Sequence, residues 1–311
     1  MMQAATIISV ILGAMVTFAP VLRTASAPAT KASLAELWVE PGLKPRNLFD
    51  GPRSVPAKQR PLTDARFDVI SKDTGGFSTT YKVRDQAGRQ WNVKIGPEAQ
   101  TEVVTARIVW ALGYHQLPSY FVERWIAVDK DTKGQQLGGA RFRPHDDGLK
   151  SKDIWSWAKN PFAGTPQLNG LLGLMMILNS TDLKDDNNEI YELEGPPREG
   201  AKRWYVVKDL GASLGETGRI EPRRGYIDGF EKEPFITGVK GGTIEFGFRG
   251  RHQELLDTIR VQDMRWICER LQKVTDQQWR DAFRAGNFTA DVTARYVARI
   301  RQKIKEGLDL R

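Results

Sequence analysis

Cysteine and histidine are scarce in this sequence, and their scarcity excludes several kinds of site. The 311 residues include one cysteine, Cys268, and three histidines, none of which stand at metal-ligand spacing. A single cysteine cannot form an intramolecular disulfide, and these few side chains cannot make a Cys/His zinc centre. Cys268 lies in the apolar pattern of Met264, Ile267 and Leu271, which is typical of a core residue and not of a nucleophile.

Internal repeats and low-complexity segments are also absent. Hydrophobic residues make up 40% of the chain and charged residues 27%, and the 29 glycines and 16 prolines are scattered along it. This composition excludes disordered and collagen-like proteins and indicates a folded chain with a large core. At roughly 100–200 residues per domain, the length fits two compact domains or one large two-lobed domain.

The charge of the chain is unbalanced toward the basic side. It has 46 Lys and Arg against 38 Asp and Glu, a net charge of +8. Such an excess favours anionic partners in general, including nucleic acid, phosphates and an anionic membrane face. No recognition motif accompanies the charge, so we expect no nucleic-acid partner. A basic surface protein that binds phosphate-rich polymers remains an alternative, and it would need the charge gathered on one face.

The longest apolar run lies near the start of the chain, at residues 4–22. It is typical of a signal-peptide core and approaches the length of a membrane span. Small residues at 25–27 resemble a cleavage site, whereas the positive charges at Arg23 and Lys31 follow the run and favour a retained anchor. We expect residues 1–27 to export the protein to the periplasm or beyond, with an N-terminal membrane anchor as the alternative. Membrane contact is expected only through this segment.

The following segments predict a sheet with one helix. Residues 28–66 contain six prolines and are expected to form an irregular strap packed on the domain. The β-rich runs 67–72, 80–85 and 90–95 are joined by short turns and predict an antiparallel meander. Residues 97–114 begin with proline, carry acidic residues in the first turns and have an apolar stripe, so they predict a helix packed on that sheet.

The remainder predicts a mainly helical lobe. Further strands are expected at 119–129, and a polar, glycine-containing stretch at 130–152 marks the expected boundary between the lobes. We therefore assign 67–130 to the first lobe and 131–311 to the second. Within the second lobe, the sequence predicts three elements and then helices to the end: an apolar helix at 167–178, strands at 189–193 and 203–207, and helix starts at Thr275 and Thr289.

The loop at 179–188, NSTDLKDDNN, gathers carboxylates, amides and a lysine. Asp182 and Asn187 stand five residues apart, with Lys184 between them. A carboxylate can accept a proton, and an amide oxygen can bind a hard cation such as Mg²⁺. Because Asp and Asn also favour turns, a plain polar turn is the alternative interpretation.

Two other segments carry charged residues next to strands. Lys94 lies inside the β-rich run QWNVKI, where a lysine facing a cleft can hold phosphates and a lysine facing solvent is ordinary. Asp209 begins the tripeptide Asp-Leu-Gly directly after the strand at 203–207. Its carboxylate offers oxygen to a hard cation, and a strand-ending turn is the simpler alternative.

The order of these motifs, over about residues 67–215, resembles the protein-kinase-like superfamily. Lys94 matches the family's V-A-I-K lysine, Asp182 with Asn187 its H-R-D-L-x-x-x-N loop, and Asp209 its D-F-G aspartate. The resemblance implies an α+β, two-lobed fold: an antiparallel sheet N-lobe with one helix, and a mainly helical C-lobe. It also implies that the protein binds a nucleotide, which is ATP, together with Mg²⁺ or Mn²⁺.

The resemblance also implies a role for each matched residue. Lys94 positions the nucleotide phosphates, Asp182 acts as the base with Lys184 beside it, and Asn187 and Asp209 hold the metal. The family pairs the strand lysine with a helix glutamate, which here is either Glu102 or Glu98, and we favour Glu102 because it lies deeper in the helix.

Several features depart from the family pattern. The turn at 73–80 lacks G-x-G-x-x-G, and an ordinary hairpin turn is the alternative there. Ser180-Thr181 replace His-Arg before Asp182, and no A-P-E segment follows. The match is therefore to atypical bacterial members, of the HipA-like or spore-coat-kinase-like kind. Residues of the turn that can still present N–H and hydroxyl groups to phosphate are Gly75, Gly76, Ser78 and Thr79.

From the resemblance we expect an ATP- and Mg²⁺-dependent phosphotransferase acting on a hydroxyl-bearing acceptor, protein or small molecule. Adenylyl transfer from the same residues is an alternative. A catalytically inactive kinase-like scaffold in the cell envelope is another, because the glycine turn is weak and an exported protein meets little ATP in bacteria.

Two minor features complete the sequence predictions. Arginines at 219, 223 and 224 offer a docking point for an anionic group or form a solvated loop. Trp155 and Trp157 are expected to pack at the junction of the lobes.

Overall fold

The structure is a computed structural model that describes residues 32–311, apart from positions 43, 54, 76–77, 130–133 and 219–221. Residues Ala32–Arg311 form one compact unit, and the expected leader at 1–27 lies outside the described residues, as do Gly76 and Arg219. Among the described residues, no helix is long and apolar enough to span a membrane.

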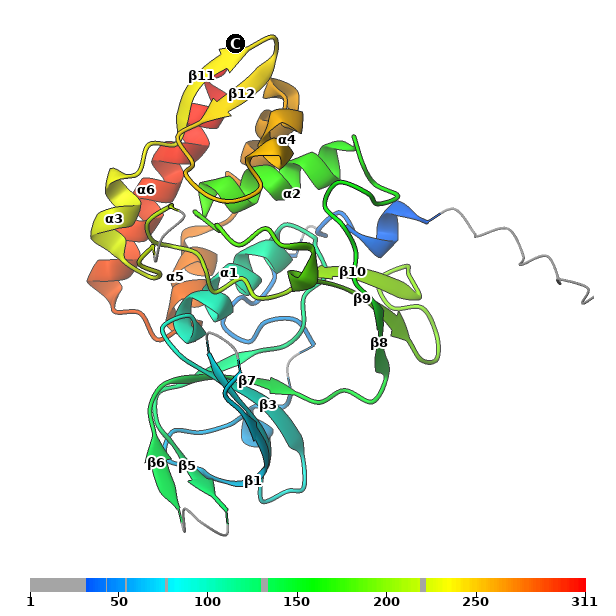
Figure 1. Cartoon of the computed structure of the whole chain (residues 1–311), viewed down its shortest axis with the longest axis vertical. Coiled ribbons are helices and arrows are strands. Elements are labelled where there is room, and N and C mark those ends of the chain that lie inside the picture. Colours follow the sequence, from blue (N-terminus) through cyan, green and yellow to red (C-terminus); the bar gives the residue numbers. More distant parts are fainter. Residues whose placement is uncertain (1–31, 43, 54, 76–77, 130–133, 219–221) are drawn as a thin grey trace, which may run out of the picture. The chain divides into compact units, whose positions relative to one another are not determined.

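The N-lobe is built on a seven-stranded sheet with the order β4-β7-β3-β2-β1-β5-β6 (Figure 1). Its strands are β1 (Arg66–Asp73), β2 (Thr79–Arg84), β3 (Gln90–Ile95), β4 (Tyr120–Val122), β5 (Trp125–Val128), β6 (Gln135–Leu137) and β7 (Ala140–Pro144). The antiparallel pairing of β1, β2 and β3 confirms the expected meander. The sheet continues through β6 and β7, past residue 130, where the sequence suggested that the first lobe ends.

Alternation along the strands separates an apolar face of the sheet from a polar one. Trp91 and Val93 of β3 are buried in a cluster with Trp125 and Phe142 from β5 and β7. Successive side chains of a strand point to opposite faces, so Asn92 and Lys94 lie on the other side of β3. The strand thereby presents Lys94 to helix α1.

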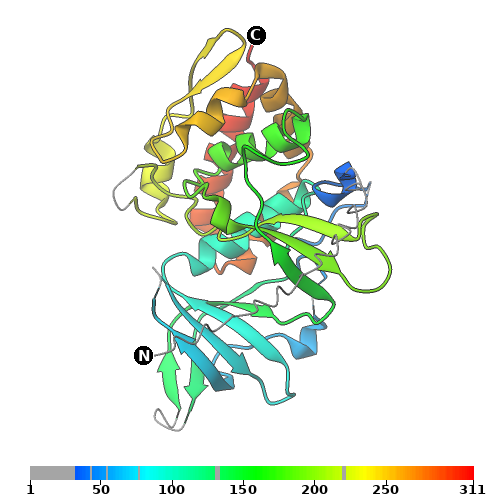
Figure 2. The ribbon, with the colours of Figure 1, turned by 45° about the vertical axis from the view of Figure 1, so that its right-hand side comes forward.

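Helix α1 (Ala99–Ala111) joins the two lobes. It begins two residues later than the expected segment 97–114, contacts β4 and β7 in the N-lobe, and packs on α5 of the C-lobe (Figure 2). Gln100 Nε2 donates to the Gly286 carbonyl at 3.0 Å, which fastens the exposed side of α1 to the C-lobe. Nearly every side chain of α1 is buried, because both lobes cover it.

The C-lobe is mainly helical, as expected for a kinase-like fold. Its helices are α2 (Pro166–Ile177), α3 (Ile227–Lys232), α4 (Val261–Leu271), α5 (Asp276–Ala285) and α6 (Ala290–Leu308), with a 3-10 turn, η4, at Gln253–Thr258. The apolar helix α2 packs between α4 and α6, which explains why it has no polar face. Thr275 and Thr289 cap α5 and α6, which confirms both predicted helix starts.

Two small sheets complete the C-lobe. One has the order β10-β9-β8, formed by β8 (Leu149–Asp153), β9 (Asn188–Leu193) and β10 (Arg203–Val207). The other is the hairpin of β11 (Ile236–Lys240) and β12 (Thr243–Phe246), in a segment where no motif predicted structure. Trp155 and Trp157 are buried, and their rings meet edge to face with centroids 5.0 Å apart. Trp155 also contacts Tyr205 of β10.

The proline-rich segment runs over the surface with few regular elements, the 3-10 turns η1 (Leu34–Glu36) and η2 (Ala57–Gln59). Leu37 and Leu48 are fully buried, and Trp38 Nε1 donates to the Leu112 carbonyl at 2.7 Å. This segment therefore packs on the end of α1.

Candidate functional site

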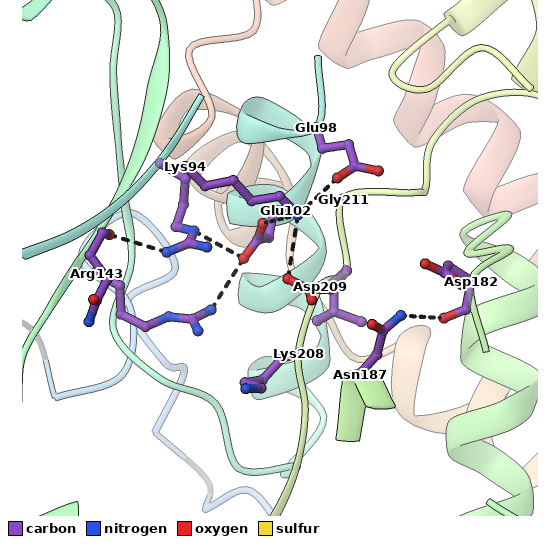
Figure 3. Close-up of polar contacts among 12 residues, drawn as sticks. Lys94, Glu98, Glu102, Arg143, Asp182, Asn187, Lys208, Asp209 and Gly211 are labelled. Carbon is purple, nitrogen blue, oxygen red and sulfur yellow. Dashed lines mark hydrogen bonds and ion pairs between the residues drawn. The ribbon is translucent and has the colours of Figure 1, made fainter. Parts of the chain in front are cut away.

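Lys94 lies at the centre of a cluster of ion pairs where three segments of the chain meet (Figure 3). Its Nζ is 2.9 Å from Glu98 Oε2, 3.4 Å from Asp209 Oδ1 and 3.5 Å from Glu102 Oε2. Strand β3 supplies the lysine, the start of α1 supplies both glutamates, and the loop after β10 supplies the aspartate. Of the residues chosen from the sequence by motif alone, Lys94 thus contacts both Glu102 and Asp209.

The two glutamates differ in what holds them. Lys94 contacts both, and the shorter distance is to Glu98, whereas the sequence favoured Glu102. Glu102 is only 1% exposed, and Arg141 Nε at 3.0 Å and Arg143 Nη2 at 3.2 Å bind its Oε1. The two glutamates lie four residues apart and so share one face of the helix, which lets one lysine reach both.

Sequence reasoning missed the arginines of this cluster. Arg141 and Arg143 lie two residues apart on β7, so they point to the same face of the sheet as Lys94, and Arg141 is the register partner of Lys94. Arg224 contacts Glu98, with Nε 2.7 Å from Oε1. The alternation Arg-Phe-Arg is the available signal, but it lies within the polar, glycine-containing stretch at 130–152 that marks the expected lobe boundary.

Burial and charge act in opposite directions on the pKa values of the cluster. Burial alone raises the pKa of Glu102, but Arg141, Lys94 and Arg143 outweigh it and hold that pKa below its usual range. Likewise burial raises the pKa of Asp209, and Lys94 with the arginines brings it below its ordinary value. Burial lowers the pKa of Lys94, and the carboxylates around it bring it above its ordinary value. All of these groups are therefore ionised near neutral pH.

The Asp-Leu-Gly segment fits closely against the start of α1. A Cβ at position 211 would lie 2.9 Å from the Glu98 carbonyl oxygen and closer still to Glu98 Cβ, so only glycine fits there without displacement. Thr101 Oγ1 donates to the Gly211 carbonyl at 2.7 Å. Asp209 itself has φ +50°, a left-handed conformation that Asp tolerates better than most residues. These contacts fix Asp209 relative to the two glutamates.

The loop with Asp182 is held by hydrogen bonds rather than by ion pairs with the cluster. Asn187 Nδ2 donates to the Asp182 carbonyl at 3.0 Å, and Lys184 Nζ is 3.1 Å from Asp182 Oδ1. The Lys208 N–H donates to the Asn187 carbonyl at 2.7 Å, which brings Asn187 next to the segment that carries Asp209 (Figure 3). The Asp182 side chain is 30% exposed and accessible to an acceptor.

The side-chain oxygens of Asn187 and Asp209 suit a hard divalent cation. Asn187 uses its amide nitrogen on the Asp182 carbonyl, so its side-chain oxygen faces away from that bond. The Asp209 carboxylate is 44% exposed, and only one of its oxygens contacts Lys94. Within the described part of the chain no group of three His, Cys, Asp or Glu converges. One carboxylate and one amide oxygen suit Mg²⁺ or Mn²⁺, which take further ligands from substrate phosphates and water.

The turn between β1 and β2 lies near the lysine. Ser78 is 9% exposed, its Oγ has no hydrogen-bond partner among the described residues, and Gly96 faces it. Thr79 pairs with Ile95, the neighbour of Lys94. The Gly75 N–H is already used, since it donates to Asp73 Oδ1 at 2.8 Å. Of the turn residues chosen from the sequence, Ser78 thus keeps a hydroxyl without a partner among the described residues, and Gly76 lies outside them.

A cavity of about 530 Å³ opens beside Asp209, between β7 of the N-lobe and strands β8 and β9 of the C-lobe. Arg143, Lys208 and Tyr191 line it, together with the chain segment that leads from β7 to β8. Its volume lies in the range of small-molecule sites.

The arginines in the loop after Asp209 have separate environments. Arg223 forms an ion pair with Glu216 and lies 3.6 Å from the centre of the Tyr226 ring. Arg224 instead reaches Glu98 and so belongs to the Lys94 cluster.

No protein-family model matches the chain, and none of the curated proteins does. Among solved structures, it is similar to the proinflammatory kinase CtkA of Helicobacter pylori, with a TM-score of 0.38 and 10% identity over 81% of this chain and 100% of that one. It is also similar to the Golgi casein kinase, with a TM-score of 0.43 and 9% identity over 79% of this chain and 73% of that one. A structure of the Golgi casein kinase with Mn/ADP bound gives a TM-score of 0.42 and 8% identity over the same shares.

Proposed function

We propose that this chain is an ATP-dependent phosphotransferase of the protein-kinase-like superfamily that acts on a hydroxyl acceptor. The observation that supports it most is the convergence at Lys94, whose Nζ lies within 3.5 Å of carboxylates from α1 and from Asp209. A scaffold has no physical need for this buried set of charges beside an open cavity. The departures in the glycine turn and the missing A-P-E segment favour an atypical bacterial branch, HipA-like or spore-coat-kinase-like.

Each residue has one task in the proposed reaction. Lys94, oriented by Glu98 and Glu102, binds the nucleotide phosphates. Asp182 accepts the proton of the acceptor hydroxyl, while the new O–P bond forms at the γ-phosphorus and the bond to the β–γ bridging oxygen breaks, so that ADP leaves. Lys184 lies beside Asp182 and supplies positive charge near the transferred group.

The proposed cofactor is Mg²⁺ or Mn²⁺, held by the oxygens of Asn187 and Asp209. When bound there, the cation would neutralise charge on the phosphates. Because Lys94 already contacts Asp209, a bound nucleotide is expected to share that lysine with the carboxylate.

The first test is a titration of the full-length chain with ATP and either Mg²⁺ or Mn²⁺, followed by thermal unfolding. At 100 times its dissociation constant a ligand stabilises by about 2.7 kcal/mol, which is readily measured. We expect metal-dependent stabilisation that is lost in Lys94→Met and Asp209→Asn. Lys82→Met is the matched control, because Lys82 is exposed on β2.

Two further measurements complete this test. ATP labelled separately at the α- and γ-phosphorus distinguishes phosphoryl transfer from adenylyl transfer to a hydroxyl acceptor. An absence of stabilisation with both metals would overturn the proposal and leave the non-catalytic scaffold.

We also propose that residues 1–27 direct export. The supporting feature is the apolar run at 4–22. N-terminal sequencing of the protein recovered from cell fractions tests this: a mature start near residue 28 in the exported fraction supports cleavage, and an intact chain in the membrane fraction supports the anchor.

A further inference from the structure

The last helix, α6, directs three buried polar side chains at the backbone of other segments. Tyr296 Oη donates to the Leu214 carbonyl at 2.8 Å, and Arg299 Nη2 donates to the Glu233 carbonyl at 2.7 Å. Lys303 Nζ donates to Asn179 Oδ1 at 2.7 Å and to the Ile177 carbonyl at 3.0 Å. Their spacing of three and four residues places all three on one face of the helix.

Lys303 is unusual because it is a fully buried lysine without a carboxylate ion-pair partner among the described residues. Its exposure is 0%, and its neighbours are two uncharged oxygens and the rings of Phe230, at 4.3 Å, and Phe235, at 5.3 Å. Burying a charge without an ion-pair partner is unfavourable, and an apolar side chain would fill the same space without that penalty. Burial lowers the pKa of Lys303 well below its ordinary value, in agreement with this environment. Stability alone does not explain the lysine.

Asn179, the partner of Lys303, stands three residues before Asp182 and has φ +51°. While its Oδ1 accepts from Lys303, its Nδ2 donates to the Gly215 carbonyl at 2.7 Å. Close by, the Leu214 N–H donates to the Leu178 carbonyl at 2.8 Å. A continuous chain of hydrogen bonds thus runs from Lys303 through Asn179 to the segment that follows Asp209.

These contacts connect the two loops of the proposed reaction. One loop carries Asp182 and Asn187, and the other begins at Asp209. The Thr181 N–H donates to the Ala212 carbonyl at 2.9 Å, so the loops also pair directly. The hydrogen bonds of Lys303 go to Ile177, the last residue of α2, and to Asn179, where the first loop leaves that helix.

We propose that Lys303 is a positioning residue for phosphoryl transfer: through Asn179 it fixes the loop of Asp182 against the segment that follows Asp209. This inference rests on the proposed function. Lys303 does not touch the Lys94 cluster, so its removal is expected to impair the chemical step and to leave nucleotide binding in place.

The test compares the full-length chain with Lys303→Met, Asn179→Gly and the double variant. Methionine keeps much of the lysine's apolar length, and glycine keeps the positive φ at position 179 while removing the amide. Lys305→Met on the same helix is the control, because the Lys305 side chain is 77% exposed. Each variant is assayed for kcat at saturating nucleotide, nucleotide Kd by thermal stabilisation, and folding by circular dichroism.

We expect Lys303→Met and Asn179→Gly each to lower kcat about tenfold to a hundredfold, since displacement of a reacting group by 1 Å has an effect of that size. Nucleotide Kd is expected to stay within about twofold of the parent value, because the groups that bind phosphate are unchanged. The double variant is expected to lose no more than the worse single variant, because both changes break the same chain of hydrogen bonds. Multiplied losses, or an unchanged kcat in Lys303→Met, would overturn the inference.

Hydrogen exchange provides a measurement that does not depend on activity. The amides of Thr181 and Leu214, which join the loops, should exchange faster in both single variants, while amides of β2 and β3 keep their parent rates. If Lys303→Met fails to fold, Asn179→Gly decides the question alone. A parent chain that transfers nothing from ATP would overturn the proposed function, whereas a parent that is active together with fully active, normally exchanging variants would overturn only the role of Lys303.

Discussion

The two halves of the candidate site are held by different kinds of interaction. Around Lys94, charges of both signs are paired within about 3.5 Å. The two glutamates form further ion pairs with Arg141, Arg143 and Arg224. The loop of Asp182 makes no ion pair with that cluster in the described structure and depends on backbone hydrogen bonds and on Asn187.

In the proposed reaction, this difference separates nucleotide binding from the chemical step. An electrostatic cluster attracts phosphates over a range of positions, because Coulomb attraction changes slowly with distance. Hydrogen bonds are directional, so those of the loop hold Asp182 in a defined position and contribute less to nucleotide affinity. Substitutions that disturb one half at a time test this separation.

The largest effect is expected from changing the aspartate in each half. Asp182→Asn should lower the transfer rate by about 10²–10⁴-fold, the usual contribution of a general base, and leave metal-dependent nucleotide binding intact. Asp209→Asn should abolish that binding, because the metal loses its carboxylate and Lys94 loses a partner. Calorimetric titration with ATP and Mg²⁺, beside a rate assay, separates the two; equal loss of binding in both variants would contradict the division.

A second effect concerns stability within the Lys94 cluster. Glu102→Gln leaves Arg141 and Arg143 buried without a carboxylate, so we expect the free energy of unfolding to fall by about 3–5 kcal/mol. Glu98→Gln should have a smaller effect, because Lys94 keeps its contacts to Glu102 and Asp209. Urea denaturation of both variants measures the difference. Equal losses would show that Glu102 is not the anchor of the cluster.

A smaller effect is expected where the cluster meets the Asp-Leu-Gly segment. Gly211→Ala places a methyl group against Glu98. The displacement needed to make room for it should destabilise the protein by about 1–3 kcal/mol and weaken nucleotide binding. Gly138→Ala is the control, because nothing lies within 4 Å of a Cβ built at that position. Unfolding curves with and without nucleotide give both quantities. A neutral Gly211→Ala would contradict the close fit.

The smallest effect is in the pH dependence of stability. Because the pKa of Lys94 is raised in the fold, its contribution is fully present below the ordinary pKa, about 10.4, and is lost as pH rises through the raised value. Because the pKa values of Asp209 and Glu102 are lowered, their contributions are present above about 4 and are lost as pH falls through the lowered values. The difference in melting temperature between the parent and Lys94→Met should therefore stay flat from about pH 5 to 9. A slope inside that range would contradict the ion pairing.

Local sequence patterns predicted the parts of the site that depend on neighbouring residues. Lys94 could be identified from its position inside a β-rich run, and Asp182 with Asn187 from their spacing within one short loop. The choice between Glu98 and Glu102 did not follow from the sequence, because residues one helical turn apart are equally able to reach the lysine. The structure brings both to it.

Contacts between distant segments escaped the sequence patterns. Arg141 and Arg143 join the site only because β7 pairs with β3, and a short strand with two arginines has the composition of a loop. Lys303 lies in an amphipathic helix whose pattern indicates which face is buried and not that one buried residue is a cation. Neither the strand pairing nor the helix contact has a local signature.

The contact between Lys303 and Asn179 also bears on the order in which the protein matures. These residues are 124 positions apart, while the bond between Arg143 and Glu102 spans 41 positions. Contacts between remote residues close large loops and form late, and synthesis delivers Lys303 after every residue of the Lys94 cluster. A nascent chain that has emerged as far as residue 250 therefore holds every residue of the Lys94 cluster, while Asn179 still lacks its partner. We expect the loop of Asp182 to reach its final position only after α6 has been synthesised.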